Sequence, residues 1–229
     1  MSASRAVAGA RRVRVWDLPT RLFHWGLVAC ISGLMVTGYI GGAAMPWHAR
    51  LGYAVLALLL FRLVWGFVGG RWSRFITFFY APRRVLAYLR GHETPDRPGH
   101  NPLGALSVFA MLAVLLAQVG SGLVSDDEIA FSGPLSRLVA ADQALWATWF
   151  HKDVGQWVIV ALVLTHIAAV MWYLLRKKTN LVKPMLDGDK SLPLASPAVA
   201  SRDDARSRLL AAVVFAGCSL AVGWVQSLG

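Results

Sequence analysis

The stretch FHKDVGQWVIVALVLTHIA, residues 150–168, decides the fold class. With the apolar residues that continue to Leu175, it is long enough to cross the hydrocarbon core of a bilayer, which takes about 20 residues. Two histidines lie in it, His151 at the start of the apolar run and His166 inside it. Polar side chains are costly inside a membrane and usually serve a function there. The stretch therefore predicts a transmembrane helix with a functional role.

The rest of the chain has the same character. It is 56% hydrophobic with a mean hydropathy of +0.52, which is unusual for a soluble domain. Apolar runs of spanning length recur along it. We therefore expect an all-α integral membrane protein, with spans at about 22–42, 51–70, 103–124, 154–175 and 209–228.

Lysine and arginine are distributed unevenly between the segments that join the spans. The N-terminal arm 1–21 has five, the loop 71–97 has six and the segment 176–208 has eight. By the positive-inside rule these regions are cytoplasmic, so we expect a bacterial inner-membrane protein with a cytoplasmic N-terminus and a periplasmic C-terminus. This distribution explains the net charge of +11 without nucleic acid. The opposite side has only Arg50, Arg137 and Lys152.

The chain divides into four parts on this basis. Residues 1–21 form a cytoplasmic arm and residues 22–186 form the main membrane domain. Residues 187–208 are rich in Pro, Ala and Ser, a composition typical of a flexible linker. Residues 209–229 form an additional C-terminal transmembrane helix.

The histidines are best compared by their depth in the membrane. His24 begins the first span at the cytoplasmic end, whereas His48 precedes the second span at the outer end. His151 opens the fourth span at the outer end, and His166 lies about 22 Å deeper at 1.5 Å per residue. Because His24 is close to Arg21, a first helix starting near Leu18 would match its depth better to that of His166. The remaining two, His92 and His100, are interpreted as solvated loop residues.

Depth leaves one way to pair these four side chains around a shared metal. His24 can meet His166 on the inner side, and His48 can meet His151 on the outer side. Zinc usually takes four protein ligands or keeps one open catalytic position, and neither depth offers a cysteine or carboxylate. Haem needs only two axial ligands, because the macrocycle supplies the other four nitrogens. The pattern therefore favours a haem between each pair.

Small residues and one arginine extend this hypothesis. Gly38, Gly120 and Gly122 lie near the outer site and would leave space for a flat ring, although ordinary helix packing explains them as well. Arg62 lies inside the second span, on nearly the same face as His48 and at the level of the inner site. A haem propionate is a natural partner for it. The alternative is that its side chain snorkels to the cytoplasmic surface.

Several motifs together resemble one family. They are VWDLPTRLFHWGLV (15–28), WHARLGYAVLALLLFRLVWGFVGG (47–70), RPGHNPLGAL (97–106) and THIAAVMWYLLRKKTNLVKPMLDG (165–188). In combination they resemble the bacterial cytochrome b561 and nickel-iron hydrogenase cytochrome b group, over residues 13 to 188. The resemblance implies a four-helix bundle with two non-covalent b haems, and the matching ligand positions here are His24, His48, His151 and His166. The fifth helix lies outside this pattern.

Two haems stacked across a bilayer would form an electron path. We therefore expect a di-haem membrane cytochrome b that carries electrons between the quinone pool, which the resemblance implies, and a periplasmic c-type cytochrome or oxidoreductase. One alternative is a superoxide:quinone oxidoreductase, and another is the anchor subunit of a hydrogenase or other dehydrogenase. An acidic outer surface favours a basic protein partner over superoxide. Its acidic residues are Asp126, Asp127, Glu128, Asp142 and Asp153.

Overall fold

The computed structural model describes residues 9–92, 98–128, 131–194 and 196–229. Within these residues, five helices are long and apolar enough to cross a membrane, as the sequence predicts. Arg5 and Arg97, which we counted for orientation, lie outside the described residues. The long helices are α1 (Leu18–Ile40), α2 (Met45–Val68), α4 (Pro102–Val124), α6 (Gln156–Leu175) and α8 (Ala205–Gln226).

Local sequence sets where three of these helices begin. Asp17 accepts a hydrogen bond from the backbone N–H of Thr20 and so caps α1, with a proline in the first turn. Asn101 caps α4 by accepting from Gly104 N at 2.7 Å, again before a proline. Asp204 caps α8 by accepting from Ser207 N. Because α1 begins at Leu18 rather than residue 22, His24 lies in its second turn, as the alternative of a first helix starting near Leu18 predicts.

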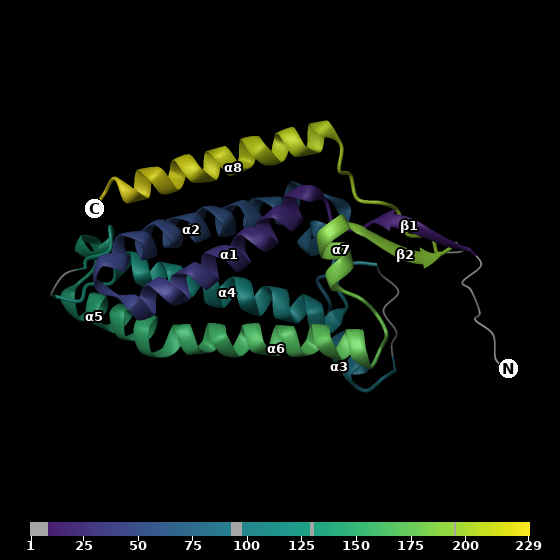
Figure 1. Cartoon of the computed structure of the whole chain (residues 1–229), viewed down its shortest axis with the longest axis horizontal. Coiled ribbons are helices and arrows are strands. Elements are labelled where there is room, and N and C mark those ends of the chain that lie inside the picture. The colour runs from purple at the N-terminus through teal and green to yellow at the C-terminus, as the bar shows by residue number, and fades with distance from the viewer. Residues whose placement is uncertain (1–8, 93–97, 129–130, 195) are drawn as a thin grey trace.

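The helices α1, α2, α4 and α6 form an elongated bundle, and α8 lies along its outside (Figure 1). The apolar core is centred on α2, where Leu59 and Trp65 are fully buried against residues of α1, α4 and α6. Ala211 of α8 belongs to the same buried cluster, and the ring of Phe215 packs edge-on against Phe61 at 6.0 Å. The fifth helix is thus packed against the bundle through α2.

At one end of the bundle, a long connection joins α4 to α6. It includes a 3₁₀ turn (Ser136–Leu138) and the short helix α5 (Ala141–Trp149). Between α5 and α6 the chain makes a π-helical turn, Phe150–Gly155. This end also holds the 3₁₀ turn Gly42–Ala44 that links α1 to α2. We call it the acidic end, because it carries Asp126, Asp127, Glu128, Asp142 and Asp153.

The opposite end, which we call the basic end, is covered by chain segments far apart in sequence. Strand β1 (Ala10–Arg14) pairs antiparallel with β2 (Asp189–Pro193). The expectation of a flexible linker over residues 187–208 is therefore wrong for its first part. A composition rich in Pro, Ala and Ser does not reveal that this part pairs with a strand near the N-terminus. The remaining elements at this end are η2 (Arg71–Ser73), η3 (Phe75–Thr77), α3 (Pro82–Leu89) and α7 (Val182–Asp187).

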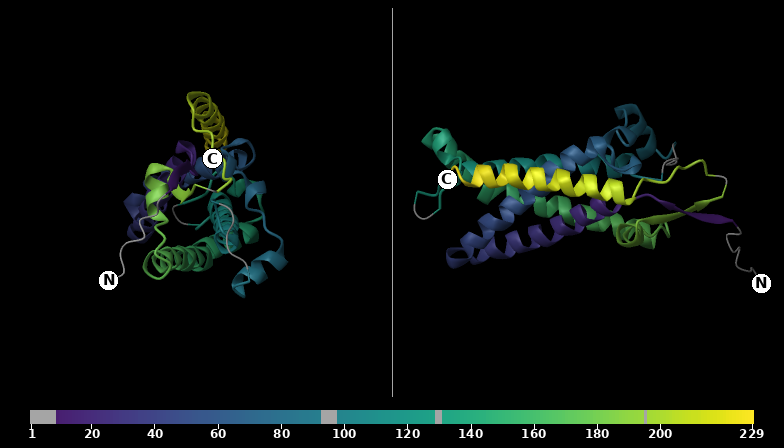
Figure 2. Two further views of the ribbon diagram at one scale, coloured as in Figure 1. Left: turned by 90° about the vertical axis from the view of Figure 1, so that its right-hand side faces the viewer. Right: turned by 90° about the horizontal axis from the view of Figure 1, so that it is seen from above.

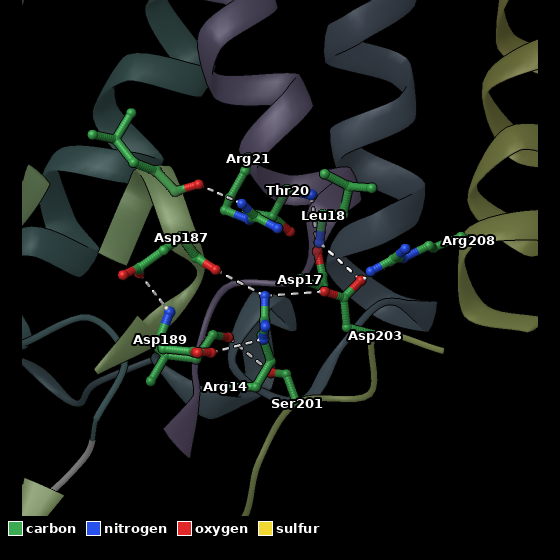
Figure 3. Close-up of polar contacts among 12 residues, drawn as sticks. Arg14, Asp17, Leu18, Thr20, Arg21, Asp187, Asp189, Ser201, Asp203 and Arg208 are labelled. Carbon is green, nitrogen blue, oxygen red and sulfur yellow. Dashed lines mark hydrogen bonds and ion pairs between the residues drawn. The ribbon is translucent and has the colours of Figure 1, made fainter. Parts of the chain in front are cut away.

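Ion pairs tie these segments to α8 (Figure 3). Arg14 of β1 pairs with Asp189 at 2.8 Å and with Asp203 at 3.3 Å, and Asp203 also pairs with Arg208 of α8 at 3.1 Å. Burial works to raise the pKa of Asp203, but its hydrogen bonds and the neighbouring arginines outweigh this, so the pKa is lowered overall. The carboxylate therefore stays ionised and links the N-terminal strand to the fifth helix.

Candidate functional site

Four histidines meet as two pairs inside the bundle. The rings of His24 on α1 and His166 on α6 have centroids 6.5 Å apart and are tilted by 52°. The rings of His48 on α2 and His151 in the π-helical turn have centroids 6.1 Å apart, at 78°. The first pair lies towards the basic end and the second towards the acidic end. These are the pairings that the depths of the residues predict.

The spacing suits a metal between two imidazoles. A bond of about 2 Å from metal to nitrogen on each side, with about 1 Å from nitrogen to ring centre, separates the centroids by about 6 Å. Within the described residues, no group of three or more His, Cys, Asp or Glu side chains could hold a metal ion. Two protein ligands per site are too few for a closed zinc site but are what haem requires.

Hydrogen bonds orient the pair near the acidic end. The carbonyl of Gln118 lies 2.8 Å from His151 Nδ1 and can only accept, so Nδ1 carries the proton and Nε2 presents its lone pair. The hydroxyl of Ser121 also lies 3.3 Å from this nitrogen. His48 Nδ1 is 3.2 Å from the hydroxyl of Thr37. Such partners on the far nitrogen commonly position metal-binding histidines.

The three predicted glycines have different surroundings. A Cβ added at Gly122 would lie 2.9 Å from His151 Cε1, and one at Gly38 would lie 3.3 Å from His48 Cε1. These two glycines therefore let α4 and α1 approach the imidazoles closely. Gly120 is exposed, and a Cβ there would meet no described atom within 4 Å, so its predicted place beside a ring has no separate support from the structure.

The side chain of Arg62 is buried, with 3% of its surface exposed. It does not snorkel to the surface, because the turns η2 and η3 fold over it. Its Nη2 donates to the carbonyl of Ser73 at 3.0 Å, and its Cζ lies 4.7 Å from the Phe75 ring. Its Nη1 is buried and has no partner among the described residues. The carboxylate charge of Asp17 acts on this guanidinium, and the free Nη1 donor leaves a place for a further acceptor, which a haem propionate fits.

Asp17 organises the basic end, a role that sequence reasoning missed. Its fully buried carboxylate accepts from Trp65 Nε1 at 3.3 Å, Gly70 N at 3.0 Å and Ser73 Oγ at 3.0 Å, besides capping α1. It therefore ties the start of α1 to the end of α2. The signal in the sequence was an Asp three residues before a helical threonine, but its long-range partners could not be read from it.

His100 differs from our interpretation of it as a solvated loop residue. Its ring packs between Trp16, with centroids 4.7 Å apart, and Phe78, with centroids 4.6 Å apart. Its Nδ1 is buried without a partner among the described residues. Burial first, and then the charges of Arg62 and His166, lower the pKa of His100 to about 3. This neutral imidazole lies close to the His24/His166 pair and gives that site a second free polar atom.

The fold and the paired histidines define a multi-pass membrane cytochrome b. Residues 15–188 match the family model described as prokaryotic cytochrome b561. The chain belongs to this family, which confirms the resemblance read from its motifs. Membership brings with it haem b and electron transfer within a membrane.

Curated relatives of similar length support this assignment. One from Bradyrhizobium diazoefficiens is 28% identical over 227 residues, covering 82% of this chain and 90% of the relative. One from Azotobacter vinelandii is 28% identical and covers 77% and 87%. Both are described as a probable Ni/Fe-hydrogenase B-type cytochrome subunit. A relative from Escherichia coli K12, the probable Ni/Fe-hydrogenase 1 B-type cytochrome subunit, is 25% identical and covers 77% and 90%.

Proposed function

We propose that this chain is the di-haem cytochrome b subunit of a membrane-bound Ni/Fe-hydrogenase complex. It would anchor the complex and carry its electrons across the bilayer to quinone. The observation that carries the proposal is the presence of two histidine pairs towards opposite ends of one bundle. The names of the relatives favour a hydrogenase over the c-type cytochrome that we first expected as the partner.

The chain's own residues would hold one haem b in each pair. His24 and His166 would bind the haem on the cytoplasmic side, and His48 and His151 the one on the periplasmic side. Bound haem iron supplies reversible one-electron chemistry. The protein would set each potential through ligand orientation, burial and nearby charge, in which Gln118 orients His151. Arg62 would hold a propionate of the haem on the cytoplasmic side.

The acidic end offers a surface for the partner. Asp126 and Asp127 lie in the connection that follows α4, and the nearby helix α5 exposes 61% of Trp146 and 51% of Trp149. Indoles of this kind lie at membrane interfaces and also anchor protein contacts. We infer that the catalytic subunits dock here, close to the His48/His151 pair. Electrons would then cross towards the basic end, where quinone would accept them.

Purification of the complex tests the proposal. The full chain, tagged and extracted in mild detergent from its native host, should co-purify with hydrogenase subunits identified by mass spectrometry. Hydrogen gas should then reduce its b-haem absorbance bands within seconds. A His48→Ala variant should keep the subunits but lose the haem at the docking end. Hydrogen should then no longer reduce the haem held by His24 and His166, because the electron path is broken. Purification as a lone subunit whose haems ignore hydrogen would refute the proposal, and rapid reduction by superoxide would favour that alternative instead.

A further inference from the structure

A cavity of about 440 Å³ lies at the basic end, between the end of α2 and the start of α8. Figure 2 shows these two helix ends beside each other, with the chain that leads from β2 into α8 looping past them. The walls of the cavity combine four arginines with apolar residues from both helices. The side chains that matter here are Val68, Arg71, Arg74, Arg202, Arg206 and Leu210.

The positive charge in this cavity is poorly neutralised. No carboxylate is among the described residues that line it. The neighbouring acidic groups are engaged elsewhere: Asp17 accepts from Gly70 N and Ser73 Oγ, Asp203 pairs with Arg14 and Arg208, and Asp204 caps α8. Arg202 is 3.9 Å from Asp204, but both side chains are exposed and such a pair is weak. The cavity is therefore a site for an anion.

One of the arginines has an unsatisfied donor. Arg74 Nε is buried and has no hydrogen-bond partner among the described residues. An arginine donor withheld from water costs free energy unless an acceptor reaches it. Phosphate oxygens suit guanidinium donors because two N–H groups can bind two oxygens side by side. The chemistry thus points to a phosphate group.

The position of the cavity indicates the source of that phosphate. It lies where two membrane helices end, at the level of lipid headgroups. Next to it, α2 exposes 73% of Phe67 and 51% of Val68, and α8 exposes 67% of Leu209 and 46% of Leu210. These apolar side chains face the hydrocarbon region below the arginines. A ligand with a phosphate head and acyl tails meets both parts of the surface, whereas free phosphate meets only one.

We propose that this cavity binds the headgroup of one anionic phospholipid, whose acyl chains lie along α2 and α8. The arginines would hold the phosphate and the exposed leucines would contact the tails. Basic pockets between transmembrane helices commonly recognise anionic lipids. The site would fasten the fifth helix to the bundle through a lipid. It is separate from the histidine pairs and does not depend on the function proposed for them.

Native mass spectrometry of the purified full-length protein tests this site. Titrated with phosphatidylglycerol, the wild type should retain one lipid in preference to phosphatidylcholine. Arg71→Gln/Arg206→Gln alters two exposed arginines, so the fold should survive, and should weaken retention at least about tenfold. Arg83→Gln/Arg90→Gln, on α3 and at its C-cap, is the matched control, because it removes the same charge at the same end. It should change retention less than about twofold.

Three results would overturn the proposal. Equal loss in both double variants would show only a diffuse positive surface. Equal retention of phosphatidylcholine and phosphatidylglycerol would remove the role of the anionic headgroup. Displacement of the lipid by inorganic phosphate at the same concentration would show a site for free anions. Preserved haem absorbance and circular dichroism in each variant confirm that the comparison is made between folded proteins.

Discussion

At the scale of single residues, the histidines are held by different means. His151 and His48 each have a partner on Nδ1, and the carbonyl partner of His151 also fixes its tautomer. His24 Nδ1 is buried and has no such partner among the described residues. Because second partners orient a ligand and raise its basicity, the two sites should differ in potential. The pair near the acidic end is the more firmly oriented of the two.

Removing one histidine tests the pairing directly. His48→Ala and His151→Ala should each lose the same haem and lower the haem content by about half, because each breaks one axial pair. His24→Ala and His166→Ala should both lose the other haem. Pyridine haemochrome assays give the content and redox titration shows which component is missing. If His48→Ala and His166→Ala removed the same component, the assignment would be wrong.

The charge of Arg62 leads to a second expectation. Arg62→Leu should lower the potential of the haem nearer the basic end by an amount on the order of tens of millivolts, since a buried positive charge favours the reduced state. Haem content should stay unchanged. Spectroscopic redox titration measures both quantities, and Arg90→Leu, an exposed change at the C-cap of α3, serves as the control. An unaltered titration curve for Arg62→Leu would exclude contact with a propionate.

Only part of this site could be predicted from residues alone. The four histidines stand out because polar groups are rare inside apolar runs, and depth then leaves a single way to pair them. Asp17 and His100 were beyond such reasoning. The carboxylate of Asp17 bonds to residues 48 to 56 positions away, and the His100 ring is packed between rings from separate segments. Neither contact has a local signature.

At the scale of the elements, the π-helical turn at Phe150–Gly155 is the main departure from regular structure. Such turns are rare and frequently occur at functional sites. Here the turn carries His151 and lies against α4, where Gln118 Nε2 donates to the carbonyl of His151 at 3.0 Å. The rise of 1.5 Å per residue used to place His166 relative to His151 assumed an unbroken α-helix and could not show this turn. The depth of His151 was still predictable, because the rise per residue changes little over one turn.

Contact between α4 and this turn gives a third prediction. Gly122→Ala would place a Cβ 2.9 Å from His151 Cε1, so the imidazole must move. Overpacking of this kind costs about 1–3 kcal/mol. We expect weaker binding of the haem at the acidic end, seen as a lower haem content after detergent washing. Gly217→Ala on α8, which meets no described atom within 4 Å, should leave the content unchanged. Equal loss in both variants would contradict a local effect.

At the scale of the whole molecule, the distribution of charge predicts an orientation in the membrane. The five spans were predictable because their length and apolar character are explicit in the sequence. The way in which distant segments cover the basic end was not predictable from the sequence. The strands β1 and β2 are five residues each and almost the whole chain apart, so neither composition nor periodicity reveals that they pair.

Orientation gives the fourth prediction. Five spans place the two termini on opposite sides, and the basic segments favour a cytoplasmic N-terminus. Alkaline phosphatase fused after Gly229 should be active, whereas the same fusion placed after Leu175 should be inactive. A fluorescent protein fused to the C-terminus should be dark, which is the matching control. Active phosphatase at the position after Leu175 would reverse the topology.

The antiparallel pairing of β1 with β2 has a consequence for biogenesis. A ribosome makes residues 10–14 almost first and residues 189–193 only after α6, so the strands cannot join until every histidine has been synthesised. Trp25 and Arg21 donate to the carbonyls of Met185 and Leu186, so their contacts also wait for this late segment. Under the proposed function, a porphyrin can therefore enter between His24 and His166 before β1 and β2 pair.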